Sequence, residues 1–373
     1  MSQPHPASSV SRQSLFGETP ESLSESAVAA GWPRRLGAQV LKWVWGRGVL
    51  DPDAMTDLSA AQRAWLGEHY SASEGIEVAA QSASDGTRKL LLAWPDAGLD
   101  DSRRTECVLI PAEGRRTACI SSQIGCPVGC RFCASGLGFD GNLTAGRIVE
   151  QVHRLGRLDG VGRISHVVFM GMGEPLANLP AVTAAIRILQ APWGGGISAR
   201  RITVSTVGVP SAIRRFSNFE LPVNLALSLH APNDELRKRI IPWAEFATIA
   251  EILDACREWF DKSGREITLE YLLLGGFNDR PEHARELAAV AKRLRSNVNL
   301  IRWNEVKGMP FDRPSSEDVL HFQRILRDRG VNTHIRASRG RDIAAACGQL
   351  RHEKSVSLGL SAKSMPAPLP PSA

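Results

Sequence analysis

The chain has 373 residues, 43% of them hydrophobic, and a formal net charge of +6. This length is enough for one large core and a small accessory domain. The sequence begins without a basic segment followed by an apolar run, and no stretch of about eighteen apolar residues occurs, so we expect neither a secretory signal nor a membrane span. The charge permits an anionic partner such as RNA without demonstrating one.

Seven cysteines occur in the chain, and three of them, Cys126, Cys130 and Cys133, crowd into one short stretch. An odd number of cysteines with a crowded loop is typical of metal or redox chemistry in a reducing compartment, not of a disulfide framework. We therefore expect a cytoplasmic protein without a membrane partner.

The first part of the chain contains two segments of different composition. Residues 1–27 are rich in Ser, Pro and Gln, which predicts a disordered tail. Residues 28–95 carry apolar residues at helical spacing and predict a small helical accessory domain with a linker. Four basic residues lie on its first predicted helix: Arg34, Arg35, Lys42 and Arg47. This face suits RNA phosphates, although an ordinary solvated helix face has the same composition.

Residues 96–352 alternate short β-rich runs with amphipathic helices, which predicts an α/β fold. The strand candidates are TACISSQ, HVVFMG, RITVST, VNLALSL, EITLEYLLL, NVNLIRW and NTHIRAS. Helices are predicted after Thr144, Thr248 and Ser315. About six β-α units predict a partial, TIM-like (β/α)6 barrel with a parallel sheet. Residues 353–373 are rich in Pro and Ser and predict a flexible C-terminal tail.

The three clustered cysteines predict an iron–sulfur centre with one open coordination position. A closed zinc site or a four-cysteine cluster needs a fourth ligand, yet the next cysteine along the chain is Cys256, on an apolar helix face. A 4Fe–4S cluster held by three thiolates leaves one iron free. The Cys-x3-Cys-x2-Cys spacing resembles that of radical S-adenosylmethionine (SAM) enzymes, in which the free iron binds the methionine moiety of SAM. A zinc knuckle completed by a distant His or Cys is the alternative.

Further polar residues follow the predicted strands, at the edge where barrels build their sites. Gly173 and Glu174, in MGMGEP, follow the strand HVVFM and place a carboxylate where a methionine ammonium would fit. The other candidates at strand ends are Ser205, Ser228, Leu229, His230 and Asn304. Each alone is typical of a structural hydrogen-bonding residue, but together they predict binding groups for SAM.

Eight motifs in order along the chain carry a family resemblance: ECVLIP, TACISSQIGCPVGCRFCASG, GMGEPLANL, RRITVSTVGV, SLHAPNDELR, EYLLLGGFND, NLIRWNEVKGMPF and SRGRDIAAACGQL. Together they resemble the RlmN/Cfr family of radical SAM methyltransferases, which act on adenosine in RNA. The resemblance runs from the helical N-terminal segment to about residue 350. It implies a radical SAM barrel with a 4Fe–4S cluster and SAM as cofactors.

The resemblance also implies a mechanism. One SAM methylates Cys347, and a second yields a 5'-deoxyadenosyl radical that takes hydrogen from the new methyl group. The resulting carbon radical adds to adenine and joins RNA to protein. Glu106 matches the base that removes the ring proton, and Cys119 matches the thiol that releases RNA through a Cys119–Cys347 disulfide. Three arginines before Cys347 are expected to line a path for RNA phosphates: Arg336, Arg339 and Arg341.

Several alternatives stay open. The leading prediction is C2 methylation of adenosine in 23S ribosomal RNA, with transfer RNA as a second substrate. A loop shorter by about one residue after the cysteines, and IRASRG in place of the usual Arg-Lys-Thr run, keep a C8-methylating Cfr-type enzyme as the close alternative. A non-catalytic iron–sulfur RNA-binding protein and a radical enzyme with a small substrate are further alternatives. We expect a monomer and an electron donor such as flavodoxin or ferredoxin.

Overall fold

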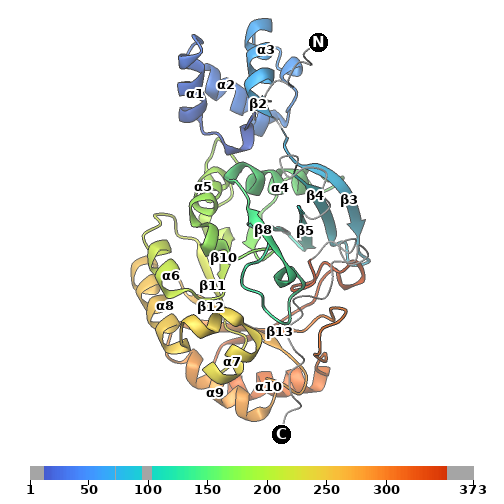
Figure 1. Cartoon of the computed structure of the whole chain (residues 1–373), viewed down its shortest axis with the longest axis vertical. Helices are drawn as coiled ribbons and strands as arrows, with labels where there is room; N and C mark the ends of the chain where they lie inside the picture. Colours follow the sequence, from blue (N-terminus) through green and yellow to red (C-terminus); the bar gives the residue numbers. More distant parts are fainter. Residues whose placement is uncertain (1–11, 72, 95–102, 351–373) are drawn as a thin grey trace, which may run out of the picture.

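The computed structural model describes residues 12–71, 73–94 and 103–350, which form a small helical domain and a larger α/β domain. The helical domain lies at one end of the long axis, beyond helices α4 and α5 of the larger domain (Figure 1). The predicted fold class, an α/β partial barrel with a helical N-terminal region, is confirmed. Within the described ranges, no helix combines the length and apolar character that crossing a membrane would need.

The N-terminal domain is built from short helices closed by one pair of strands. Its elements are β1 (Gln13–Ser14), η1 (Leu15–Gly17), α1 (Pro20–Ala29), α2 (Leu36–Leu41), η2 (Lys42–Arg47), η3 (Pro52–Ala54), α3 (Ala60–His69) and β2 (Tyr70–Ser71). Strands β1 and β2 pair in parallel and tie the start of the domain to its end. Phe16 in η1 is fully buried, and η1 packs against α4, so the domain shares the main hydrophobic core.

Helix α1 corrects the prediction of a disordered tail over residues 1–27. The Thr19 side chain accepts a hydrogen bond from the Ser22 backbone, the Ser22 side chain accepts one from the Thr19 backbone, and Pro20 occupies the first turn. This capping box starts a helix whose Leu23 and Ala27, four residues apart, are buried. The Ser- and Pro-rich composition of the segment concealed this local signal. Residues 1–11 and the predicted tail 353–373 lie outside the described residues.

A ten-stranded mixed sheet forms the centre of the larger domain. Its order is β14-β13-β12-β11-β10-β9-β6-β5-β4-β3, with both ends open. The strands are β3 (Ile76–Ser82), β4 (Arg88–Ala93), β5 (Arg104–Ala112), β6 (Arg115–Cys119), β9 (His166–Phe169), β10 (Ile202–Thr206), β11 (Asn224–Ser228), β12 (Ile267–Leu273), β13 (Ser296–Arg302) and β14 (Thr333–Arg336). Strands β6 and β9 to β14 are parallel, as predicted for the barrel, whereas β3 to β6 are antiparallel.

Helical connections between the parallel strands cover the sheet. They are α4 (Ala145–Arg157), η6 (Pro175–Asn178), α5 (Leu179–Gln190), η7 (Ala199–Arg201), α6 (Pro210–Phe216), α7 (Asp234–Ile240), η8 (Pro242–Phe246), α8 (Ile249–Ser263), α9 (Pro281–Ala291) and α10 (Ser316–Asp328), with η9 (Arg341–Ile343) near the end. The predicted caps Thr144, Thr248 and Ser315 each accept a hydrogen bond from the backbone three residues on. The three predicted helix starts are confirmed.

The boundary between the two domains differs from the predicted one. We predicted a helical domain with its linker over residues 28–95 and the barrel over 96–352, yet β3 and β4 already belong to the large sheet. Strand β4 pairs with β5 from Arg88 to Ala93. The helical domain therefore ends near residue 71. The spacing of apolar residues within 28–95 does not reveal this boundary, because it depends on the pairing of β4 with β5, a strand later in the chain.

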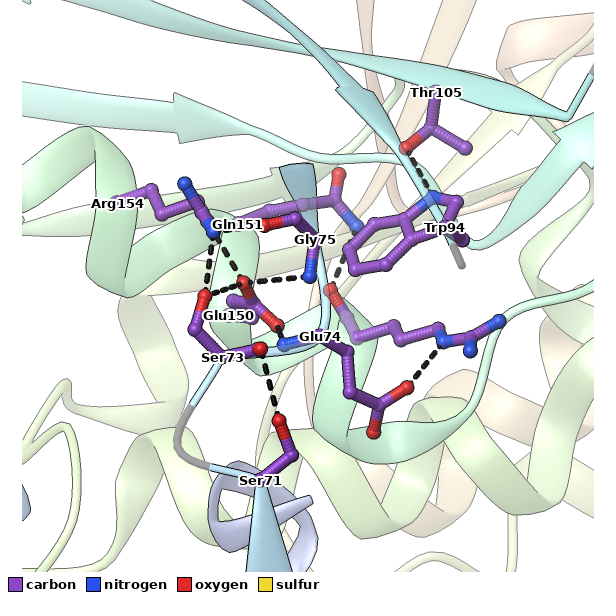
Figure 2. Close-up of polar contacts among 10 residues, drawn as sticks. Ser71, Ser73, Glu74, Gly75, Trp94, Thr105, Glu150, Gln151 and Arg154 are labelled. Atoms are coloured by element: carbon purple, nitrogen blue, oxygen red, sulfur yellow. Dashed lines mark hydrogen bonds and ion pairs between the residues drawn. The ribbon is translucent and has the colours of Figure 1, made fainter. Parts of the chain in front are cut away.

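A buried carboxylate fixes the linker between the domains. Glu150 of α4 accepts hydrogen bonds from Ser73 Oγ (2.8 Å), Glu74 N (2.9 Å) and Gly75 N (3.0 Å). Its Oε1 also lies 2.8 Å from Arg154 Nε. Figure 2 shows the linker wrapped around this side chain. Because a charged acceptor replaces water for two backbone N–H groups, the linker is held against α4.

We expect Glu150→Gln to lower the free energy of unfolding by about 1.5–3 kcal/mol, because hydrogen bonds to a buried charge are lost. The measurement is urea unfolding followed by fluorescence. Glu258→Gln is the matched control, since its ion pair with Arg214 is exposed and its loss should cost at most about 1 kcal/mol. Equal losses for the two variants would contradict a special role for Glu150.

Candidate active site

The three clustered cysteines lie on a tight loop between β7 (Gln123–Gly125) and η5 (Ala134–Leu137). Cys126 N donates to the Gly138 carbonyl (2.8 Å), and Cys133 N donates to the Cys130 carbonyl (3.2 Å). Gly125 has a φ of 74°, and a Cβ there would overlap the Gly138 carbonyl oxygen. Only glycine fits this crossing, which turns the chain so that the loop faces the sheet.

The cysteine loop forms one wall of an open cavity with an empty volume of about 860 Å³. The other walls come from the C-terminal ends of β9 to β14, as expected for a barrel site. Five of the residues predicted to bind SAM line it together with the three cysteines and Cys347: Gly173, Glu174, Ser205, Ser228 and His230.

The donor set suits an iron–sulfur cluster. Burial raises the pKa of the Cys126 thiol to about 12, and it also raises the pKa values of Cys130 and Cys133. Metal binding replaces those protons. Among the described residues, no three His, Cys, Asp or Glu side chains converge on a single ion. A 4Fe–4S cluster does not need such convergence, because each thiolate binds a different iron.

Glu174 anchors the glycine-rich turn after β9. Its Oε1 accepts from Leu176 N (3.1 Å) and its Oε2 from Val207 N at the end of β10 (2.7 Å). Burial raises the pKa of Glu174 to about 7 in spite of these bonds. A cationic group in the cavity would favour the ionised form. The carboxylate is therefore placed where an ammonium ligand would be complementary.

His230 presents a neutral imidazole to the cavity. Burial, together with the neighbouring Arg237, lowers its pKa to about 3. Leu272 N donates to Nδ1 (3.1 Å), so the ring proton is on Nε2. The residue has a left-handed φ of 58°, and its ring contacts Phe132 of the cysteine loop edge-on. This strained turn aims a hydrogen-bond donor at the cavity.

Two predicted residues do not line the cavity but support it. Leu229 has a buried side chain, and its carbonyl accepts from Arg237 Nε (3.2 Å). Asn304 is buried, and its Nδ2 donates to the Cys347 carbonyl (3.3 Å) while its Oδ1 accepts from Arg313 (2.9 Å). Their predicted contact with SAM stays a prediction, whereas Asn304 holds the backbone of Cys347.

Cys119 and Cys347 come together although they are far apart in the sequence. Cys119 ends β6 and is buried, whereas Cys347 is half-buried at the cavity wall, and both are free thiols. Burial and the neighbouring Cys347 together raise the pKa of Cys119 to about 12. The resting Cys119 is therefore a thiol, which has to lose its proton before it can attack sulfur.

Glu106 lies in β5, next to this pair but outside the cavity wall. Its neighbour two positions on, Val108, is paired with Cys119, so Glu106 and Cys119 project from the same face of the sheet. Glu106 is 3% exposed, and its Oε1 lies 2.9 Å from Lys89 Nζ. The carboxylate thus lies on the face of the sheet that carries Cys119, on the antiparallel side of β6.

Some cavity residues were missed or misplaced by the sequence interpretation. Arg336, expected on an RNA path, lines the cavity, because β14 ends there, and its Nη1 lies 3.9 Å from Glu270 Oε2. The Cys347 sulfur raises the pKa of Arg336 and Glu270 adds to the effect. Met170 also lines the cavity. A carboxylate within the apolar run EITLEYLLL was the one signal that pointed to Glu270.

The fold and the cysteine loop define the class of protein. The family model described as "Radical SAM superfamily" matches residues 120–288, which include the loop, and "Ribosomal RNA large subunit methyltransferase N-terminal domain" matches residues 14–71. The latter match agrees with a helical domain that ends near residue 71. The larger domain is therefore that of a radical SAM enzyme.

Relatives narrow the class. A "Probable dual-specificity RNA methyltransferase RlmN" from Rhodopirellula baltica is 46% identical over 85% of this chain and 84% of its own length. The protein of that name from Gloeobacter violaceus is 45% identical over 90% of this chain and 94% of its own length. A crystal structure of a radical SAM methyltransferase from Sphaerobacter thermophilus has a TM-score of 0.87 and 40% identity, and the match covers 91% of this chain and 99% of that one.

The chain belongs to the RlmN family of radical SAM RNA methyltransferases. As a radical SAM enzyme it uses a 4Fe–4S cluster and SAM, and its substrate is RNA. The predictions of family, enzyme class and cofactors are confirmed. The roles of individual residues, the RNA position and the methylated carbon stay predictions.

We expect Cys130→Ala to abolish cluster binding, because two thiolates do not hold the cluster. The measurement is iron content and visible absorbance after anaerobic reconstitution. Cys256→Ala is the matched control: this thiol is buried on α8 away from the cavity, so the variant should bind iron like the parent. Full iron content in Cys130→Ala would contradict the assignment of the loop.

Proposed function

We propose that the protein methylates C2 of adenosine in 23S ribosomal RNA and in a transfer RNA, with a methyl group carried by Cys347. The observation that carries the proposal is the position of Cys347, which lines the cavity of the cysteine loop and lies near Cys119. A cysteine at this point reaches both a cofactor in the cavity and a second thiol. Ring carbons of adenine are poor nucleophiles, so direct transfer from SAM does not suffice and a carrier with radical chemistry is needed.

The residues divide the work as follows. Cys347 accepts a methyl group from one SAM and becomes a thioether. Cys126, Cys130 and Cys133 would hold the cluster, which would supply the electron that cleaves a second SAM and would take one electron back from the radical adduct. After the methylene radical on Cys347 has added to the adenine ring and this electron has left the adduct, Glu106 removes the ring proton. Cys119 then attacks the Cys347 sulfur, the carbon–sulfur bond breaks, the freed carbon takes a proton, and a disulfide remains.

The cavity residues support SAM binding in this scheme. We propose that Glu174 accepts from the methionine ammonium, and that the Nε2–H of His230, Ser205 and Ser228 bind the remaining polar groups of SAM; all four residues line the cavity. Leu229 and Asn304 contribute through the backbone: the Leu229 carbonyl accepts from Arg237, and Asn304 Nδ2 donates to the Cys347 carbonyl. The disulfide has to be reduced after each turnover, and a flavodoxin or ferredoxin is the proposed electron donor for the cluster. We propose that the enzyme acts as a monomer.

We expect Cys119→Ala to accumulate a covalent RNA–protein adduct, because the thiol that breaks the carbon–sulfur bond is absent. Cys347→Ala should give neither adduct nor methylated adenosine. Both variants are incubated anaerobically with SAM, reductant and RNA. The adduct is then measured on denaturing gels, and methylated adenosine is measured by mass spectrometry of the digested RNA. Cys107→Ala is the matched control, since Cys107 is buried on the neighbouring strand and should leave turnover intact. Undiminished RNA methylation by Cys347→Ala would refute the scheme.

Mass spectrometry of the digested RNA product separates the two closest enzymatic alternatives. We expect 2-methyladenosine from ribosomal RNA and from transfer RNA. The appearance of 8-methyladenosine alone would assign the protein to the Cfr-type branch. In that case the carrier role of Cys347 would remain, and the predicted carbon would be wrong.

A further inference from the structure

Lys89 is a buried lysine for which the proposed scheme has no role. It lies on β4, is 6% exposed, and its Nζ is 2.9 Å from Glu106 Oε1. The same Nζ donates to the Ala344 carbonyl (3.3 Å), three residues before Cys347. A buried ion pair costs much of what it gains, so it is weak evidence for stability. Stability therefore does not explain why Lys89 lies between the proposed base, Glu106, and the Cys347 segment.

The strand register places Lys89 in line with the reacting groups. Lys89 is paired with Val108 on β5, and Val108 is paired with Cys119 on β6. Residues directly opposite each other share a face of the sheet, so Lys89 and Cys119 lie on the same face with Val108 between them. Glu106, two residues from Val108, shares that face. Ala345 packs on it against Val108 and Cys119.

The segment before Cys347 is held to the β3–β4 hairpin along its length. Asp85 Oδ2 accepts from Gly340 N (3.1 Å), and Ser84 N donates to Asp342 Oδ2 (2.8 Å). Ala344 has a φ of 49°, a left-handed conformation that is uncommon for alanine. The contact from Lys89 stabilises the carbonyl of this strained residue. Lys89 is thus a buried member of a series of contacts in which Ser84 and Asp342 are exposed and Asp85 is half-buried.

We propose that Lys89 is a positioning residue that holds the Glu106 carboxylate and the Cys347 segment in one geometry, so that the base meets the ring proton of the RNA adduct. This inference rests on the roles proposed above for Glu106 and Cys347. A buried carboxylate that loses its cationic partner is less stable in the ionised form, so a smaller fraction of Glu106 is ionised and able to accept the ring proton. Methylation of Cys347 by SAM needs no base of this kind and is independent of the ion pair.

The test compares Lys89→Met with the parent, with Glu106→Gln and with Lys292→Met, an exposed control at the end of α9. Three quantities are measured anaerobically: methylation of Cys347 without RNA, the covalent RNA adduct, and single-turnover formation of methylated adenosine. We expect Lys89→Met to methylate Cys347 within about threefold of the parent. Release of methylated RNA should slow by about tenfold to hundredfold, with accumulation of adduct as in Glu106→Gln.

The double variant Lys89→Met/Glu106→Gln shows whether Lys89 acts through Glu106. It removes both charges together, so neither is left buried without its partner. We expect its rate of RNA release to equal that of Glu106→Gln within about threefold, because two residues that act on one step are not additive. A slowing of RNA release in the double variant that equals the product of the two single-variant effects would overturn the proposal. Equal losses of Cys347 methylation and RNA release in Lys89→Met would also overturn it, since they indicate a structural defect.

The controls separate failure of this inference from failure of the proposed function. If Glu106→Gln accumulates adduct while Lys89→Met releases RNA as fast as the parent, the role of Lys89 is wrong and that of Glu106 stands. If the parent forms neither methyl-Cys347 nor methylated adenosine, the proposed function itself is wrong.

Discussion

The backbone hydrogen bond from Ala134 N to the Gly348 carbonyl, 2.8 Å long, joins the cysteine loop to the C-terminal segment, and the rest of the site depends on this junction. Ser135 Oγ adds a bond to the Leu350 carbonyl (2.9 Å), and Asn304 holds the Cys347 carbonyl. These bonds restrain the backbone around Cys347, which fits the carrier role that we propose for its side chain.

Because the barrel is not closed, the sheet continues beyond the cavity into antiparallel strands. A closed barrel would surround one mouth only, whereas here β6 continues into the antiparallel strands β5, β4 and β3. Those strands bring Glu106 and Lys89 to the face that carries Cys119. Glu106 and Lys89 thus lie on the antiparallel side of β6, whereas the parallel strands form the walls of the cavity that Cys347 lines.

Several buried charged side chains lie where separate segments of the chain meet. Glu150 and Arg154 join the linker to α4, Lys89 and Glu106 join two strands to the Cys347 segment, and Arg237 joins the ends of neighbouring parallel strands. Ionic groups in the interior cost desolvation energy but demand a specific geometry. Their placement favours accurate positioning of segments over maximal stability.

Local patterns determined the helix starts, the positions of the parallel strands along the chain and the cysteine loop, because a cap or an alternation depends on residues a few positions apart. The family resemblance, not spacing, singled out Glu106, Cys119 and Cys347. Composition alone misled at α1, where a capping box starts a helix in a Ser-rich segment. The tertiary structure alone decided that Arg336 lines the cavity and that Lys89 meets Glu106 and Ala344. Those contacts depend on the register between strands and on the docking of the C-terminal segment, and no short stretch of sequence encodes either.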